Sequence, residues 1–471
     1  MEVRLPQQEF TVPPAGFRVD QPAMPSRQAR QAERSPARLT KVPWSWGASL
    51  ALLALGVSIV ACGSDASAPD VVVPPPPNVV AEQLPTLTVN TTNGFAITSR
   101  EVYLPGAFRL AGADGAMLQE GSLEIRGRGH STWDIMPKKP YRLKLSNSTA
   151  LMGMPANRHW VLLANYSDKT MIRNDATFEL SRMMGMEYTP RSTFVDLMLN
   201  GSYQGIYQLT EHIRIAPERV NIPELKVADT SATAVTGGYL IEIDERRGES
   251  YCFNSSNTPM IFCLGNPESL LDPAWAKQRA YITNYIQQTD ASIFSSQFAD
   301  PAAGYAAYID VESAISYYLV NEMLKNVDGN LRLSTYLYKK RGGKLFFGPL
   351  WDFDLAYGNV NYDGADRIDG WHIRTTPWFT RLFQDPAFAA RVKARWRQMK
   401  SDRTIDKLFQ YIVARHDYLA KVQVRNFERW PILSTWVWPN RVVTGSYDGE
   451  VLAMGDWLFD RIKWMDAQIG L

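Results

Sequence analysis

The hydrophobic pattern of this chain changes its period near residue 272, and this change constrains the fold more than any other feature. Before that point the apolar residues come in short runs that alternate with polar ones, which is typical of β-strands. Two such runs around an Asn200-Gly201 turn predict a β-hairpin. After that point the apolar residues recur with helical spacing, as in 275–289 and 311–326. We therefore predict an α+β protein in which a strand-rich half precedes a mostly helical half.

The first 85 residues are predicted to be a targeting signal and a tether rather than part of the folded domain. Residues 47–61 form an uncharged apolar run after several basic residues, which is typical of a signal peptide and too short for a comfortable transmembrane helix. Cys62 ends this run in a pattern that resembles a bacterial lipobox, although a cysteine can also follow an apolar run by chance. We predict a lipoprotein signal peptide at 1–61, a lipid on Cys62 and a Pro-rich tether at 62–85. The expected location is the bacterial cell envelope, either at the outer membrane on its periplasmic face or at the cell surface.

The composition is that of a globular protein and excludes some partners. Hydrophobic residues make up 45% of the 471 residues, which is enough for a large core in one or two domains. The formal net charge is only +2, so we expect no nucleic acid partner, and we expect contact with a membrane only through the lipid. Cys252 and Cys263 remain after Cys62 is set aside. An even pair in an oxidising envelope predicts a disulfide rather than a metal site, since no histidine lies nearby in the sequence.

Two acidic motifs are candidates for chemistry, and their aspartates Asp328 and Asp352 lie 24 residues apart. Asp328 lies in an Asn-Val-Asp-Gly-Asn turn after a predicted helix, where its carboxylate is free to accept a proton. Asp352 and Asp354 follow a predicted strand and offer oxygen ligands for Mg²⁺. Each acid alone is more often structural, as a loop cap or the partner of a buried arginine. The combination instead favours a site that transfers a phosphoryl group.

A basic, glycine-rich segment precedes the acidic motifs. The residues 126–129 read Arg-Gly-Arg-Gly, and they offer two cations and two backbone positions that a phosphate can approach closely; these residues are Arg126, Gly127, Arg128 and Gly129. Lys139, or Lys144 on the strand that follows, can pair with phosphate oxygens. A turn with solvated arginines is the simpler interpretation of such a loop when it stands alone. With the acids, the segment predicts a site that holds both a metal and a phosphate.

Six segments occur in an order that closely resembles the CotH kinase family, named for the spore-coat protein H. The resemblance runs from about residue 88 to the C-terminal helices, and the segments are IRGRGHSTW…KKPYRLKL, HWVLLANYSDKTMIRN, LNGSYQGIYQLTEHI, GGYLIEID, NEMLKNVDGN and GPLWDFDLAYGN. It implies an atypical protein-kinase-like domain at 86–471, with a strand-rich N-lobe (about 86–270), a helical C-lobe (about 271–471) and a cleft between them. It also implies transfer of the γ-phosphate of ATP, with Mg or Mn, to Ser or Thr of a secreted or surface protein.

The same resemblance implies roles for individual residues. Asp328 matches the catalytic aspartate, Asp352 the metal-binding aspartate and Lys139 the lysine that pairs with phosphate. Glu211 and Glu242 are similar to family acids near the site, and either is a candidate partner of the lysine.

The chain departs from the family six residues after the catalytic aspartate, where many members carry an asparagine and this chain carries Ser334. A hydroxyl is a poorer ligand for Mg²⁺ than an amide carbonyl, and Asn330 is the alternative oxygen donor in this turn.

Two other functions remain open on the sequence alone. One is a surface binding or adhesion module on a degenerate kinase scaffold. The other is a glycan-active envelope protein that uses the many tryptophans and a pair of carboxylates. A kinase cleft should gather Lys139 and either Arg126 or Arg128 with Asp328 and Asp352. A glycosidase cleft should instead place aromatic platforms beside two isolated acids.

Overall fold

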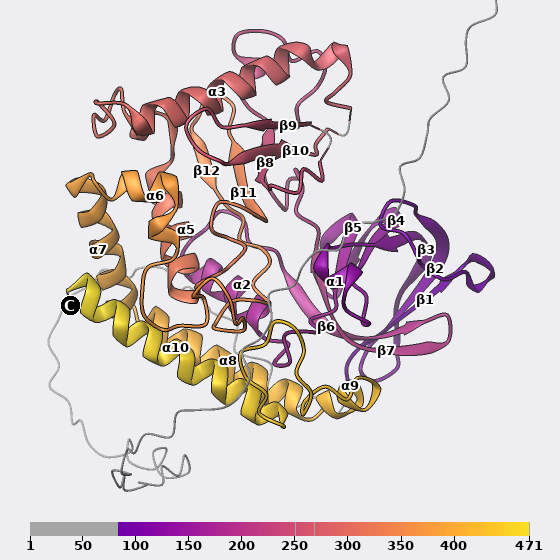
Figure 1. The fold of residues 1–471 in the computed structure, drawn as a ribbon. Helices are drawn as coiled ribbons and strands as arrows, with labels where there is room; N and C mark the ends of the chain where they lie inside the picture. Colours follow the sequence, from indigo (N-terminus) through magenta and orange to yellow (C-terminus); the bar gives the residue numbers. More distant parts are fainter. Residues whose placement is uncertain (1–82, 250, 268, 471) are drawn as a thin grey trace, which may run out of the picture. The chain divides into compact units, whose positions relative to one another are not determined.

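A computed structural model describes residues 83–249, 251–267 and 269–470. The predicted signal peptide, the Cys62 lipidation site and nearly all of the Pro-rich tether lie outside these ranges. The described part combines strands and helices, which confirms the predicted α+β class (Figure 1). Within it, no helix is both long enough and apolar enough to cross a membrane.

The first seven strands close into a barrel in the order β1-β2-β3-β4-β5-β7-β6, drawn from indigo to magenta in Figure 1. All neighbours pair antiparallel except β1 and β6, which are parallel. Leu143 and Leu145 of β4 are buried in the barrel core, whereas the intervening Lys144 points to the other face, as the alternation predicted. The Asn200-Gly201 turn joins β6 to β7, which confirms the predicted hairpin. The strands are β1 (Thr86–Thr91), β2 (Leu104–Ala111), β3 (Met117–Gly127), β4 (Tyr141–Leu151), β5 (Met154–Leu163), β6 (Ser192–Leu199) and β7 (Ser202–Glu211).

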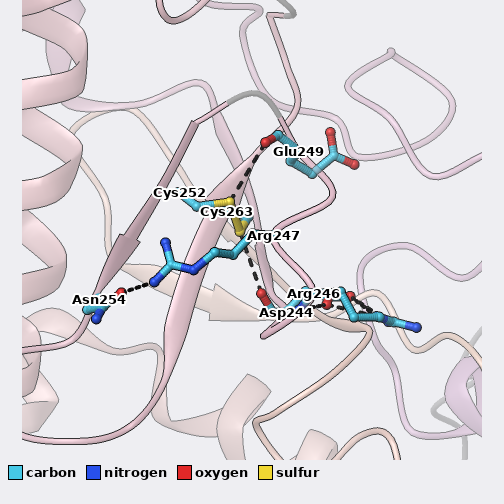
Figure 2. Close-up of a disulfide and its surroundings, with 7 residues drawn as sticks. All are labelled: Asp244, Arg246, Arg247, Glu249, Cys252, Asn254 and Cys263. Carbon is cyan, nitrogen blue, oxygen red and sulfur yellow. Dashed lines mark hydrogen bonds and ion pairs between the residues drawn. A yellow bond between two sulfur atoms is a disulfide. The ribbon is translucent and has the colours of Figure 1, made fainter. Parts of the chain in front are cut away.

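A second sheet has five strands in the order β12-β11-β8-β10-β9. Its strands are β8 (Tyr239–Ile243), β9 (Tyr251–Asn254), β10 (Ile261–Leu264), β11 (Thr335–Lys339) and β12 (Leu345–Phe347). Because β8 pairs with β11, the sheet joins strands from both sides of residue 270, where the two lobes were expected to divide. The β9–β10 pair carries the Cys252–Cys263 disulfide, which confirms the predicted cysteine pairing (Figure 2).

The helices surround one nearly fully buried helix, α5, which packs against α7, α10 and β12. The Asp310 carboxylate caps its start by accepting from the Ser313 N–H at 2.8 Å, and Lys325 ends it in the left-handed conformation. The α-helices are α1 (Ser131–Asp134), α2 (Arg173–Met183), α3 (Ala276–Phe294), α4 (Tyr305–Tyr308), α5 (Val311–Leu324), α6 (Pro377–Leu382), α7 (Pro386–Ser401), α8 (Thr404–Ala420), α9 (Gln423–Arg429) and α10 (Tyr447–Ile469). Short 3₁₀ helices lie at Thr92–Gly94, Ala234–Thr236, Pro273–Trp275 and Ile373–Thr375.

Candidate active site

A cleft with a volume of about 290 Å³ lies where four segments leave their elements, after β3, β8, α5 and β12. It brings together the two acidic motifs and the glycine-rich segment, which lie far apart in the sequence. The predicted site residues that line it are Arg126, Gly127, Arg128, Gly129, Glu242, Asp328, Asp352 and Asp354.

The carboxylates of Asp328, Asp352 and Asp354 form an acidic wall of this cleft. Burial, and next the charge of Asp352, raise the pKa of Asp328 above its usual range. Burial and the charges of Asp352 and Asp328 likewise raise the pKa of Asp354 well above its usual range. Carboxylates that lie close together repel one another, and a bound cation removes this repulsion. The acidic wall therefore fits a divalent metal. In the part of the chain that the structure describes, no group of three or more His, Cys, Asp or Glu side chains has metal-binding geometry.

The backbone holds Asp352 in an unusual conformation. Its φ of +66° lies in the left-handed region, which costs a residue with a Cβ roughly 1 kcal/mol. The next residue, Phe353, is fully buried, and its N–H donates to Asn174 Oδ1 at 2.7 Å. Since a buried neighbour fixes the strained backbone, the Asp352 carboxylate is aimed into the cleft rather than free to turn away.

A short hydrogen-bond chain ends at the Asp352 carboxylate. Ser334 Oγ donates to Asp352 Oδ2 at 3.0 Å and accepts from Arg246 Nη2 at 2.9 Å. Arg246 in turn donates from Nε to Asp244 Oδ1 at 2.8 Å. The Ser334 hydroxyl is therefore engaged in holding Asp352. The alternative ligand, Asn330, has a buried Oδ1 without a hydrogen-bond partner among the described residues, but it is not among the described residues that line the cleft.

The cationic side of the cleft comes from the barrel. Arg126 of β3 and Arg142 of β4 are direct cross-strand neighbours, and both line the cleft. Like charges in this position destabilise a strand pair, and a bound anion relieves their repulsion. Arg128 lies with its guanidinium 5.5 Å from the ring centroid of Trp351, so the barrel loop contacts the segment that carries Asp352.

In the glycine-rich segment, two of the backbone N–H groups are already bonded within the protein. The N–H of Gly127 donates to Ser99 O at 2.9 Å and that of Arg128 donates to Pro140 O at 3.2 Å, so neither is free for a phosphate. A Cβ on Gly127 would lie 2.4 Å from the Trp133 ring, so this glycine makes room for an indole. These two N–H groups are therefore taken, whereas the side chains of Arg126 and Arg128 line the cleft.

The structure does not bring the two predicted lysines to the cleft. Lys139 Nζ donates to the carbonyl oxygen of Trp133 and lies 5.6 Å from the centroid of the same ring. Lys144 Nζ lies 2.7 Å from the carboxylate of Glu124 on the neighbouring strand. Neither lysine is among the described residues that line the cleft.

Of the two predicted glutamates, one lines the cleft and the other does not. Glu211 is fully buried away from the cleft, where it accepts from Arg191 Nε at 3.2 Å and from the Tyr188 hydroxyl at 3.2 Å. Glu242 lines the cleft, and burial, followed by the charge of Asp244, raises its pKa to about 8. Of the two acids, only Glu242 is placed to act in the site.

Three arginines that line the cleft were missed by the sequence reasoning. Arg142 shares a strand face with Lys144. The alternation of apolar and polar residues places both on that face but does not say which lies nearer the cleft. Arg246 follows the apolar strand β8 within a charged Asp-Glu-Arg-Arg stretch, which was a usable signal. Arg100, whose Nη1 donates to Gly129 O at 2.7 Å, lies in an irregular segment without any such signal.

The aromatic side chains bear on the glycan alternative. Tyr336 and Trp351 supply the phenol and indole rings among the described residues that line the cleft. The Trp351 ring is buried, stacks on Phe178 at 5.9 Å between centroids and is covered by Arg128 on the cleft side. The cleft therefore lacks the open aromatic platform, within the described residues, that a sugar would stack on.

The fold and the cleft define an α+β protein in which carboxylates and guanidinium groups meet in one cleft, as in a kinase-like phosphotransferase. A family model described as CotH kinase protein matches residues 124–465. The chain therefore belongs to the CotH kinase family, which confirms the family that the six segments indicated. No curated protein matches the chain at a significant level.

Proposed function

We propose that this chain is an ATP-dependent protein kinase that transfers the γ-phosphate to a Ser or Thr hydroxyl of another protein. The observation that carries the proposal is the meeting, in one cleft, of Asp328 and Asp352 with Arg126 and Arg128. Phosphoryl transfer needs little more than a positioned hydroxyl, cations against the phosphates and carboxylates for a metal. This cleft offers each of these groups in a chain whose family supports such chemistry.

Asp328 is the proposed base. It lines the cleft in a turn that is held by two backbone contacts: its N–H donates to Asn326 Oδ1 and its carbonyl accepts from the Leu333 N–H, both at 3.2 Å. The raised pKa brings this carboxyl closer to neutral pH, where a base accepts a proton most effectively. Asp328 would orient the acceptor hydroxyl and take its proton.

Asp352 and Asp354 are the proposed ligands of a divalent metal, Mg or Mn. Carboxylate oxygens are the ligands these hard cations prefer, and the crowding of the two acids with Asp328 supports a cation there. When bound, the metal would neutralise charge on the transferred phosphate. Ser334 would keep the Asp352 carboxylate in position through its hydrogen bond.

Arginines are proposed to take the part that the resemblance assigned to Lys139. Arg126 and Arg142 are cross-strand neighbours that both line the cleft, and Arg128 lies close to the Asp352 segment. A guanidinium group can donate to two phosphate oxygens at once. Arginines in place of a lysine would therefore keep a cation against the phosphate but bind it with a different geometry.

The proposed place of action is the cell envelope, with the chain held by a lipid on Cys62. The lipobox-like sequence supports this proposal. The Cys252–Cys263 disulfide also supports it, because such bonds persist in oxidising compartments.

The test is phosphate transfer by the full-length chain purified in mild detergent. Wild type, Asp328→Asn, Asp352→Asn and the control Asp456→Asn, an exposed acid on α10, are incubated with γ-labelled ATP and either Mg²⁺ or Mn²⁺. The acceptors are the chain itself and a serine-rich synthetic peptide. We expect transfer by wild type and the control, and a loss of at least about 100-fold in the two site variants. Equal behaviour of all four proteins would contradict the proposal.

A further inference from the structure

A second hollow, which we call the outer groove, lies beside the barrel between the ends of β4 and β5 and the segment 214–224. Its volume is about 730 Å³. The polar residues that line it are Ser148, Asn157, Arg158, His159, Arg214 and Asn221, and Glu224 is the carboxylate among the described lining residues. The proposed phosphotransfer chemistry uses none of these residues.

The segment 214–224 is built as a fixed wall. Ile215 and Val220 form a β-bridge, and both side chains are buried in one hydrophobic cluster. The N–H of Val220 donates to Arg214 O, and the N–H of Ala216 donates to Val220 O, each at 3.2 Å. A groove with such a wall is formed before any ligand arrives, which reduces the entropy cost of binding.

The electrostatics of the outer groove favour an anion. The charges that act most strongly on His159 are those of Arg214, Arg142, Arg219 and Lys144, all of them cationic. Together with burial they lower the pKa of His159 to about 3, so the ring is neutral at physiological pH. Its Nδ1 is buried and has no hydrogen-bond partner within the described residues. Of these cations Arg214 lines the groove, as does Arg158, and an anionic ligand there would meet these two guanidinium groups.

The outer groove is close to the active-site cleft. His212 lines the cleft, and the centroid of its ring lies 6.2 Å from that of His159, which lines the groove. Arg142 also lines the cleft, and its charge acts on both imidazoles. The two rings are tilted at 45° to one another and lie between the two hollows, so the groove and the cleft are neighbours.

We propose that the outer groove binds a phosphorylated segment of the acceptor protein. Guanidinium groups such as those of Arg158 and Arg214 bind phosphate through two parallel hydrogen bonds. The volume far exceeds that of a free phosphate ion, and Ile215 and Ile222 add an apolar wall that fits a peptide. A concave site of this kind fits a peptide better than it fits the flat surface of a membrane. The inference rests on the proposed function: a segment phosphorylated in one turnover would be held here while the next hydroxyl enters the cleft.

The test is direct binding, which does not depend on catalysis. Fluorescence anisotropy of a fluorescein-labelled peptide with three phosphoserines is measured with the full-length chain in detergent, beside the same peptide without phosphate. We expect wild type to prefer the phosphopeptide at least about tenfold, and Arg158→Gln with Arg214→Gln to lose that preference. Arg403→Gln, at an exposed arginine that pairs with Asp406, should bind as wild type does. Arg158→Gln alone keeps the experiment decisive if the double variant unfolds, because Arg158 is an exposed side chain.

The outcomes separate this inference from the kinase proposal. Asp328→Asn should bind the phosphopeptide as wild type does even though it transfers no phosphate. Equal binding of the two peptides by wild type, or unchanged binding after Arg158→Gln, would overturn the inference. So would full displacement by inorganic phosphate at the concentration of the peptide, which would indicate a site for the free ion. Tighter binding to vesicles of anionic lipid than to the phosphopeptide would overturn it as well.

Discussion

Ser334 Oγ donates a hydrogen bond of 3.0 Å to Oδ2 of Asp352. The same hydroxyl accepts from Arg246, so it links the loop after β8 to the proposed metal ligand. Ser334 stands where many family members carry an asparagine, and its geometry gives the residue a positioning role in place of metal ligation.

Ser334→Ala should therefore slow phosphate transfer without abolishing it. Loss of one hydrogen bond to a charged group costs about 1–2 kcal/mol, which corresponds to a fall in kcat/KM of roughly five- to thirtyfold. The Mg²⁺ concentration for half-maximal rate should rise, whereas the KM for the acceptor should not change. Initial rates over a range of Mg²⁺ concentrations measure both quantities. Ser334→Thr, which keeps the hydroxyl, is the matched control, and an alanine variant as active as wild type would contradict the role.

Gly127→Ala should destabilise the barrel edge and the cleft together. The added Cβ would lie 2.4 Å from the Trp133 ring, so either the ring or the loop has to move. Overpacking of this kind costs about 1–3 kcal/mol, measured as the free energy of unfolding in urea. Gly455→Ala is the control, since its φ, like that of Gly127, lies outside the left-handed region and no atom lies within 4 Å of the added Cβ. The double variant Gly127→Ala with Trp133→Leu should recover part of the lost stability.

Glu242→Gln should change the pH dependence of stability. The pKa of Glu242 is about 8 in the folded chain and near its ordinary value of 4.5 when unfolded. Between these values the folded state holds a proton that the unfolded state has released, so wild type loses stability as pH rises from about 4.5 to 8. The glutamine variant lacks this loss and should gain about 1–3 kcal/mol on wild type between pH 5 and pH 8. Urea unfolding at both pH values measures the gain.

The control for that measurement is Glu120→Gln, an exposed acid paired with Arg109 on the neighbouring strand. It should show the same difference from wild type at pH 5 and at pH 8. A Glu242→Gln difference that is constant with pH would mean that Glu242 is ionised in the folded chain throughout this window.

Reduction of the Cys252–Cys263 disulfide should lower stability and also slow transfer. The cysteines are separated by 11 residues, and closure of so small a loop is worth about 3 kcal/mol through the entropy of the unfolded chain. Cys263 Sγ lies 3.6 Å from Asp244 O, and Figure 2 shows the disulfide beside Asp244 and Arg246. Loosening this hairpin should therefore disturb the bond from Arg246 to Ser334. Thermal unfolding and transfer rates with and without dithiothreitol test this, and a Cys252→Ser, Cys263→Ser variant should not respond to the reductant.

The sequence predicted the acidic half of the site better than the basic half. Asp328 and Asp352 both line the cleft, and they could be picked out because a turn after a helix and the end of a strand are local features that constrain where a side chain points. Lys139 was misplaced because packing decides its direction: Trp133 lies against Gly127 and draws the lysine to its own carbonyl. Arg142 and Lys144 have the same local pattern, and only the position of the cleft along β4 distinguishes them.

The same distinction applies to the fold. The α+β class, the β6–β7 hairpin and the disulfide follow from periodicity, an Asn-Gly turn and the cysteine count. Closure of the barrel by the parallel pair β1–β6, and the pairing of β8 with β11, depend on contacts between distant residues. No local pattern specifies such partners, because any apolar strand of similar length satisfies the same alternation.

The pairing of β8 with β11 also constrains how the protein can assemble. A chain is synthesised from its N-terminus, so β8, β9 and β10 are made before β11 and β12. Until β11 is made, β8 presents an unpaired edge to water and to any neighbouring strand. An unpaired edge of this kind favours aggregation until β11 is in place.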